Sequence, residues 1–123
     1  MPHTELQFYQ ETNGEVPLVG WLKSLPAKVQ DKCLVKLERL EALGYELRRP
    51  EADYLRDDIY ELRVRFQRVN YRMLYFFFGA AAVVVSHGLI KEDTVPDQEI
   101  ALAVEHKRKV TADPRRHLFR PEE

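Results

Sequence analysis

Apolar residues near the start of the chain are spaced in a way that predicts one strand followed by a short helix. Residues 6–9 form a brief run with two aromatic side chains, which is typical of a strand, and its shortness favours an edge position. Pro17 suits the first turn of a helix, and apolar residues at three-residue spacing continue this helix until Pro26 interrupts the pattern.

A longer helix is predicted for residues 27–43, with Gly44 as its C-cap because glycine is common just after helices. Its apolar residues recur on one stripe, which indicates the face that packs into the core: Val29, Cys33, Leu37 and Leu40. Because Cys33 lies on this stripe, we expect it to be an inert core residue.

The strongest strand signals lie in the second half of the chain. Three apolar runs at residues 59–66, 69–79 and 80–88 are separated by short polar or glycine breaks and predict an antiparallel meander. The aromatic run 75–78 is apolar on both faces, which favours a strand covered on both sides over a base-stacking platform. Residues 45–58 before the meander carry Pro50, many charges and no sustained period, so a surface loop is predicted.

The C-terminal part predicts one last helix. Thr94 precedes Asp97 by three residues, as in a capping box, and cations at 107–109 lie near the expected C-terminal end before Pro114. The predicted order β-α-α-β-β-β-α gives an α+β fold with a small, mainly antiparallel twisted sheet packed against helices. We expect a single domain over residues 1–113 and a flexible tail over 114–123.

Length and composition support a single globular unit. The chain has 123 residues, of which 45% are hydrophobic and 32% charged, and no apolar run approaches the roughly 20 residues that a membrane helix needs. The N-terminus shows no signal-peptide pattern, and the lone Cys33 cannot form an internal disulfide. These features favour a soluble cytoplasmic protein.

The charge pattern restricts any nucleic-acid function to a local patch. The net charge is −1, which does not provide the positive field of a non-specific nucleic-acid binder. One stretch does hold an excess of arginines over acids: Arg48, Arg49, Arg56, Arg63, Arg65, Arg68 and Arg72 against Glu51, Asp53, Asp57, Asp58 and Glu61. The excess is small, so the placement of each arginine matters more than their number.

A series of short motifs then points to a known family. They occur in this order: Trp21-Leu22-Lys23-Ser24-Leu25-Pro26, Tyr60-Glu61-Leu62-Arg63, Tyr71-Arg72, Tyr75-Phe76, and a segment from His87-Gly88 to Pro96. In this order and spacing, over residues 16–109, the chain resembles the phage-derived HigB-like branch of the RelE/ParE toxin superfamily. The resemblance implies a RelE-like fold and mRNA cleavage, usually on the ribosome, without a metal or other cofactor. It also implies a helix-turn-helix antitoxin as partner.

The chain departs from the family pattern at two places. The family usually has two consecutive lysines after the last strand, whereas here Glu92 follows Lys91. Family members often carry a lysine in the loop before the second strand, where this chain has Ala52, Asp53, Tyr54 and Arg56.

Arginines are the best candidates for the chemistry. Metal-free RNA cleavage needs a base for the 2′-hydroxyl, cations for the phosphate and an acid for the leaving oxygen. Strand alternation directs Arg63 and Arg65 to one face and Leu62, Val64 and Phe66 to the other, and guanidinium groups bind phosphate in a bidentate way. The alternative is that Arg63 and Arg65 only solvate a half-exposed sheet and pair with Glu61.

Three more residues complete the predicted catalytic set. Arg72 interrupts an apolar strand, so it must reach a rim or find a partner. His87 and Lys91 are expected to line the same sheet edge as Arg63, with His87 as the proton carrier. The alternatives are a structural hydrogen-bonding role for His87 and an exposed loop position for Lys91.

The remaining arginines are predicted to contact the RNA backbone. Arg48, Arg49 and Arg56 belong to this peripheral set together with Arg65, although solvated loop charge is the simpler reading. The four histidines show no zinc-type spacing, and no nucleophile elbow or phosphate-binding glycine loop occurs. We therefore expect no metal site.

Three functions remain open. The leading one is the toxin of a type II toxin–antitoxin system that cleaves mRNA on ribosomes and inhibits translation. The second is a non-enzymatic toxin of the ParE kind that binds gyrase. The third is a degenerate toxin that serves as an antitoxin-binding regulatory module.

Overall fold

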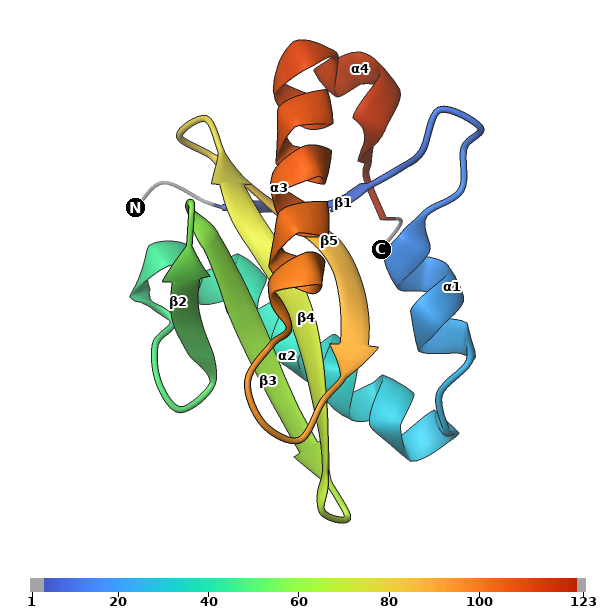
Figure 1. The fold of residues 1–123 in the computed structure, drawn as a ribbon, viewed down its shortest axis with the longest axis vertical. Helices are drawn as coiled ribbons and strands as arrows, with labels where there is room; N and C mark the ends of the chain where they lie inside the picture. Colours follow the sequence, from blue (N-terminus) through green and yellow to red (C-terminus); the bar gives the residue numbers. More distant parts are fainter. Residues whose placement is uncertain (1–3, 122–123) are drawn as a thin grey trace.

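The computed structural model describes residues 4–121, which form one six-stranded sheet with helices on both faces (Figure 1). The elements follow the chain in this order: β1 (Glu5–Tyr9), α1 (Pro17–Lys23), α2 (Ala27–Leu43), the 3-10 helix η1 (Gly44–Glu46), β2 (Ala52–Arg56), β3 (Ile59–Phe66), β4 (Val69–Phe78), β5 (Ala82–Ile90), α3 (Asp97–Ala112), α4 (Pro114–His117) and β6 (Leu118–Phe119). No helix in this described part is both long and apolar enough to cross a bilayer.

The strands lie in the order β2-β3-β4-β5-β1-β6. The predicted meander is confirmed, because β3 pairs antiparallel with β4 and β4 with β5. The sheet is mainly antiparallel, with β1 parallel to β5 and antiparallel to β6, so the α+β prediction is confirmed. The edge position expected for the first strand is wrong, because β1 lies between β5 and the short β6.

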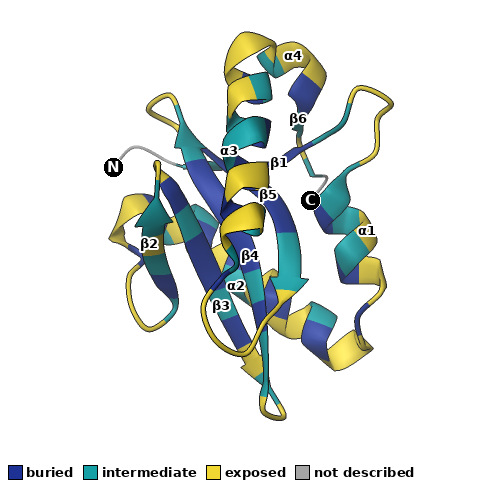
Figure 2. Cartoon of the chain, viewed as in Figure 1, coloured by how far each residue is buried: buried dark blue, intermediate teal, exposed yellow. Residues whose placement is uncertain are grey.

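Two apolar clusters pack on the two faces of the sheet. Helices α1 and α2 cover one face, where the predicted stripe of α2 is buried against Leu62 and Met73. Helix α3 covers part of the other face, where Ile100 and Ala103 pack with Leu74. Figure 2 shows the central strands as largely buried, whereas the outward side of α3 and the loops are exposed.

The prediction that the aromatic run 75–78 of β4 is covered on both sides is confirmed. Tyr75 belongs to the cluster under α1 and α2, and Phe76 belongs to the cluster under α3. Both side chains are almost fully buried. They are core residues and cannot offer a stacking surface to a ligand.

Gly44 ends α2 as predicted. Its φ angle is +53°, its N–H donates to the carbonyl of Leu40, and a Cβ at this position would lie 2.6 Å from the hydroxyl of Thr4. Gly88 meets a different need, because a Cβ there would lie 2.2 Å from the ring of Trp21. The Trp21 and Gly88 motifs of the sequence are thus parts of one packing contact.

The surface loop predicted for residues 45–58 is wrong in part. The segment contains η1 and the strand β2, whose Ala52 and Tyr54 are the partners of Leu62 and Tyr60 in β3. The partner strand supplies the hydrogen bonds that stabilise β2, although the local sequence is highly charged.

Two further expectations differ from the structure at the C-terminal end. Residues 114–119, expected in a flexible tail, form α4 and β6, and His117 is buried. The strand β6 pairs with β1, and His117 Nδ1 lies 2.9 Å from the carbonyl oxygen of Gln10. The capping box of Thr94 and Asp97 is absent, since α3 begins after Pro96, which provides no side-chain cap.

Candidate functional site

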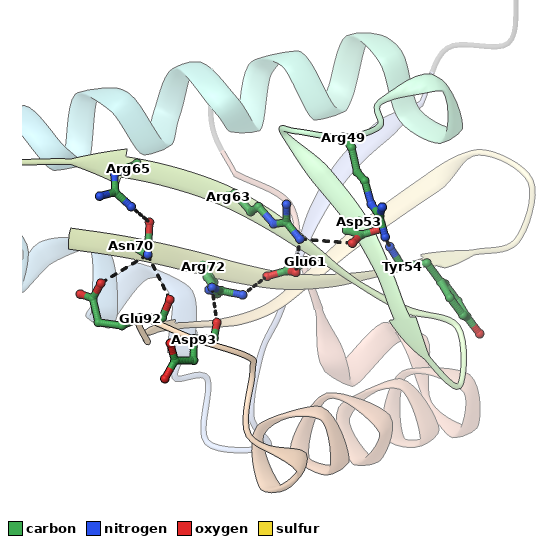
Figure 3. Close-up of polar contacts among 10 residues, drawn as sticks. All are labelled: Arg49, Asp53, Tyr54, Glu61, Arg63, Arg65, Asn70, Arg72, Glu92 and Asp93. Atoms are coloured by element: carbon green, nitrogen blue, oxygen red, sulfur yellow. Dashed lines mark hydrogen bonds and ion pairs between the residues drawn. The ribbon is translucent and has the colours of Figure 1, made fainter. Parts of the chain in front are cut away.

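Polar side chains gather on the part of the sheet that α3 leaves uncovered (Figure 3). Strand alternation places Leu62 and Val64 in the core under α2, which confirms that Arg63 and Arg65 point to the opposite face. On β4, Arg72 is the register partner of Arg63, and Asn70 is that of Arg65. We call the set Glu61, Arg63, Arg65, Asn70 and Arg72 the arginine face.

Glu61 is the centre of the arginine face. Its carboxylate accepts from Arg63 Nη2 at 2.9 Å and from Arg72 Nη1 at 2.7 Å, and only 3% of its side chain is exposed. A buried carboxylate is costly unless it is paired and hydrogen-bonded, and here two guanidinium groups provide the pairing. The pair predicted between Arg63 and Glu61 is therefore present, and Arg72 joins it.

The two arginines differ in access to solvent. The side chain of Arg63 is 39% exposed and that of Arg72 is 11% exposed. Arg63 Nη2 also contacts Asp53 at 3.2 Å, and Arg72 Nη2 donates to the carbonyl oxygen of Asp93. Arg72 has thus found partners within the fold, while Arg63 keeps part of its guanidinium open.

The loop after β5 closes one side of the arginine face. Arg65 Nη1 donates to Asn70 Oδ1 at 3.1 Å. Asn70 Nδ2 in turn donates to two oxygens of Glu92, the backbone carbonyl oxygen at 3.3 Å and the carboxylate Oε1 at 3.4 Å. The backbone N–H of Lys91 donates to the carbonyl of Asn70 at 3.2 Å, and the Lys91 side chain is exposed. Glu92, at the position where the resemblance predicts a second lysine, thus lies directly at this face.

A cavity of about 700 Å³ borders the arginine face, between α2 and the ends of β3 and β4. β2 pairs with β3 only as far as Leu62, so the edge of β3 beyond this residue borders the cavity. The charged lining residues are Lys32, Lys36, Arg63, Arg65 and Arg72 against Asp31 and Glu51. We call this space the arginine cavity, and its excess of cations suits an anionic ligand.

Two of these cations were not identified from the sequence. Lys32 and Lys36 lie four residues apart on α2, and Lys32 Nζ is 5.6 Å from the ring centre of Phe66. Arg39 and, to a smaller extent, Lys36 donate hydrogen bonds to Glu51 and lower the pKa of its carboxyl to about 2. Their i,i+4 spacing indicated that the two lysines share one face of α2. It could not show that this face borders the arginines, because the packing of α2 on the sheet was not known from the sequence.

His87 lies apart from the arginine face, beneath α3. Residue 86 is the extra residue of a β-bulge, since Leu74 pairs with His87 and Tyr75 with Val85. The bulge directs both Ser86 and His87 towards α3, contrary to the expectation that His87 lines the same open edge as Arg63.

The ring nitrogens of His87 are both engaged. Nε2 lies 2.9 Å from Glu99 Oε1, and Nδ1 lies 2.8 Å from Ser86 Oγ, which is also 2.7 Å from His106 Nδ1. Burial lowers the pKa of His87, although the hydrogen bond with Glu99 opposes this shift. This arrangement fits the structural alternative for His87.

The peripheral arginines are distributed along the β2 side of the sheet. Arg48 is exposed, and no ion pair to it occurs within residues 4–121, whereas Arg49 contacts Asp53 at 3.0 Å. Arg49 is the main cause of the lowered pKa of Asp53. Arg56 contacts Asp97 at 2.6 Å and thus links β2 to the first turn of α3, away from the arginine face.

A known family matches most of the chain. The model of a family described as phage derived protein Gp49-like (DUF891) matches residues 20–108. A search of curated proteins found no match. The matched segment includes every element from α2 to β5 and therefore the whole arginine face.

Proposed function

Because the chain belongs to the family of phage-derived Gp49-like proteins, which are HigB-like toxins of toxin–antitoxin systems, we propose that it cleaves mRNA on the ribosome. The observation that carries the proposal is the side-by-side placement of Arg63 and Arg72 at a cationic cavity. A phosphodiester gains negative charge in the transition state of cleavage, and fixed guanidinium groups stabilise such charge.

The proposed reaction is a transesterification within the RNA. The 2′-oxygen forms a bond to phosphorus, its proton passes to a base, and the bond from phosphorus to the 5′-oxygen breaks. The leaving 5′-oxygen takes up a proton, so the products carry a 2′,3′-cyclic phosphate and a 5′-hydroxyl. This chemistry requires no change of oxidation state, and the phosphate charge is its main electrostatic demand.

Arg63 is the proposed phosphate contact. Both of its hydrogen bonds within residues 4–121 run from Nη2, which leaves Nη1 to donate to a phosphate oxygen. Arg72 is less exposed than Arg63, and its proposed role is to add positive charge beside Arg63 and to hold Glu61 in place through their ion pair. Lys91, at the rim, is proposed to assist, and Arg65 to contact the RNA backbone.

His87 has no catalytic part in the proposal. Its side chain lies beneath α3, and each of its ring nitrogens has a partner. The proposed role of His87 is to anchor α3 through Glu99. We further propose that a helix-turn-helix antitoxin neutralises the toxin, as the resemblance to HigB-like toxins implies.

The test is the substitution Arg63→Ala in a host strain that carries no antitoxin. We expect the variant to relieve growth arrest and to reduce mRNA cleavage about a hundredfold, because it removes a group that stabilises transition-state charge. Primer extension on a reporter mRNA measures the cleavage. Arg108→Ala is the matched control, since Arg108 is an arginine on α3 that pairs with Glu105 and is not among the residues that line the arginine cavity.

The outcomes separate the candidate functions. Full cleavage by a well-expressed Arg63→Ala variant contradicts the assignment of Arg63. Growth arrest by the unaltered protein with intact mRNA and a DNA-damage response contradicts cleavage and indicates a gyrase-binding toxin.

A further inference from the structure

A second hollow lies on the other side of β2 from the arginine face and has a different lining. It has a volume of about 600 Å³, and its lining residues are Tyr45, Leu47, Arg48, Arg49, Ala52, Asp53, Tyr54 and Tyr60. We call it the tyrosine pocket. None of the residues predicted as catalytic lines it, but it adjoins the arginine face through Asp53, which contacts both Arg49 and Arg63 (Figure 3).

The tyrosines of this pocket are exposed and yet held in place. Tyr45 is 61% exposed and stacks with one ring face on Phe77 at a centroid distance of 3.7 Å. Tyr54 is 51% exposed, and its hydroxyl accepts from the N–H of Asp58 at 3.1 Å. The ring of Tyr54 also packs edge to face on that of Tyr60, with a centroid distance of 5.2 Å. Aromatic side chains this exposed and this constrained are typical of a prepared binding surface.

The charges around the pocket select among possible ligands. Arg48 and Arg49 flank the tyrosines, and Asp53, the one acid among the lining residues, is already paired with Arg49 and Arg63. An anionic ligand with flat aromatic groups matches this lining. Single-stranded nucleic acid is such a ligand, because its bases stack on aromatic rings and its phosphates bind arginine.

We propose that the tyrosine pocket binds an unpaired nucleobase of the RNA, stacked on Tyr45 or Tyr54, with the adjoining phosphate held by Arg48. This inference rests on the proposed function, since it places the pocket on the path of the RNA that the arginine face cleaves. The RNA crosses the edge of the sheet at β2, from the tyrosine pocket past Asp53 to Arg63. The pocket thereby adds affinity for single-stranded RNA and sets the register of the scissile phosphate.

The test measures binding apart from cleavage. A fluorescently labelled 2′-O-methyl oligoribonucleotide is titrated with the full-length protein at low salt, because it has no 2′-hydroxyl to react. We expect Tyr54→Ala and Tyr45→Ala each to weaken binding about tenfold, as loss of one stacking contact predicts. Tyr54→Phe keeps the ring but loses the hydrogen bond from Asp58, so it should lose less affinity than Tyr54→Ala.

Two controls assign the effect to base stacking. Leu34→Ala changes an exposed apolar residue on α2 that lines neither cavity and should not alter the Kd. An abasic oligonucleotide of the same length should bind more weakly and equally to the unaltered protein and both alanine variants. An effect of Tyr54→Ala that is equally large on the abasic strand overturns the stacking assignment.

Failure of this inference and failure of the proposed function give different results. Equal Kd values for the unaltered protein, Tyr45→Ala and Tyr54→Ala contradict RNA binding at the tyrosine pocket, whatever Arg63→Ala does to cleavage. A lack of binding by the unaltered protein contradicts it as well. Tyrosine-dependent binding without any mRNA cleavage supports the pocket as a single-strand site and contradicts the nuclease proposal.

Discussion

Glu61 determines how the cations of the arginine face are held. Its buried carboxylate joins Arg63 and Arg72 across neighbouring strands, so both guanidinium groups are oriented before any ligand arrives. Orientation in advance reduces the entropy that binding must otherwise offset. The negative charge of Glu61 also offsets the repulsion between Arg63 and Arg72, so the fold can hold the two cations together without RNA. A phosphate that binds Arg63 must compete with this carboxylate.

Substitution of this carboxylate should be strongly destabilising. Glu61→Ala leaves the guanidinium of Arg72 buried without its carboxylate partner, and we expect the free energy of unfolding to fall by about 3 kcal/mol. Urea unfolding at neutral pH measures the change. Glu105→Ala, which removes the exposed partner of Arg108, should leave stability nearly unchanged. A Glu61→Ala variant within about 1 kcal/mol of the unaltered protein would contradict the structural role of the pair.

The buried histidines make stability depend on pH. Burial lowers the pKa of His106 from its usual 6.5 to about 4, and the nearby His87 adds to this shift. Three more distant charges have smaller effects: Glu11 and Glu105 raise the pKa, and Lys109 lowers it. The unfolded chain therefore binds more protons than the folded chain between these values. His106 stabilises the fold least below pH 4, and its full contribution is present above pH 6.5.

We expect acidification from about pH 7 to about pH 4 to cost on the order of 2 kcal/mol through His106. Urea midpoints across this range measure the loss. His106→Phe keeps an aromatic ring against Tyr9 but cannot titrate, so its stability should fall less over the same range. If the variant and the unaltered protein lose stability in parallel, His106 is not the titrating group.

At the scale of helices and strands, the C-terminal segment completes the sheet edge. The buried His117 stacks on Tyr9 at a centroid distance of 5.5 Å and bonds to the backbone of Gln10, while β6 pairs with β1. Tyr9 is fully buried between His106 and His117. Residues 114–119 therefore protect a core aromatic residue rather than extend away from the domain.

His117→Ala tests this docking. The substitution removes the ring that covers Tyr9 and leaves the Gln10 carbonyl without its partner, so we expect a loss of about 1–3 kcal/mol in the free energy of unfolding. Thermal unfolding followed by circular dichroism measures it. Arg115→Ala, an exposed residue on the same helix, should leave the melting temperature unchanged. Equal melting temperatures for the two variants would mean that the segment adds no stability.

The pattern of apolar residues predicted the long elements but not the short ones. The bounds of α2 and β3 agree with the periodicity, because each has a continuous apolar face that local sequence reveals. β2 and β6 have only five and two residues, too few for a clear apolar pattern, and they form by pairing with β3 and β1. The bulge at Ser86 likewise depends on pairing with β4, which is why the position of His87 was not predicted.

Within the candidate site, alternation alone was sufficient to place Arg63 and Arg65 on a common face. The bridging role of Glu61 required the register of β3 against β4, and the cations of α2 required the packing of that helix on the sheet. The tyrosine pocket was missed because Tyr45 and Tyr54 belong to the segment predicted to be a loop.

For the whole molecule, the uneven covering of the sheet leaves the arginine face open to a polar ligand. Helices α1 and α2 cover one face, and α3 covers part of the other, so the remainder of that face carries the arginines. The net charge of −1 does not prevent this, because the lining of the arginine cavity alone holds five cations and two acids. Local charge, not the total, then governs the approach of an anion.

The most direct measurement of the central claim is the chemistry of mRNA ends produced on purified ribosomes. The protein is added to ribosomes that translate a defined mRNA, and the fragments are mapped and tested for a 5′-hydroxyl. We predict cleavage within the translated region, 5′-hydroxyl ends, and a loss of about a hundredfold in rate for Arg63→Ala. Intact mRNA on translating ribosomes, with an active and well-folded protein that still arrests growth in cells, would contradict the account.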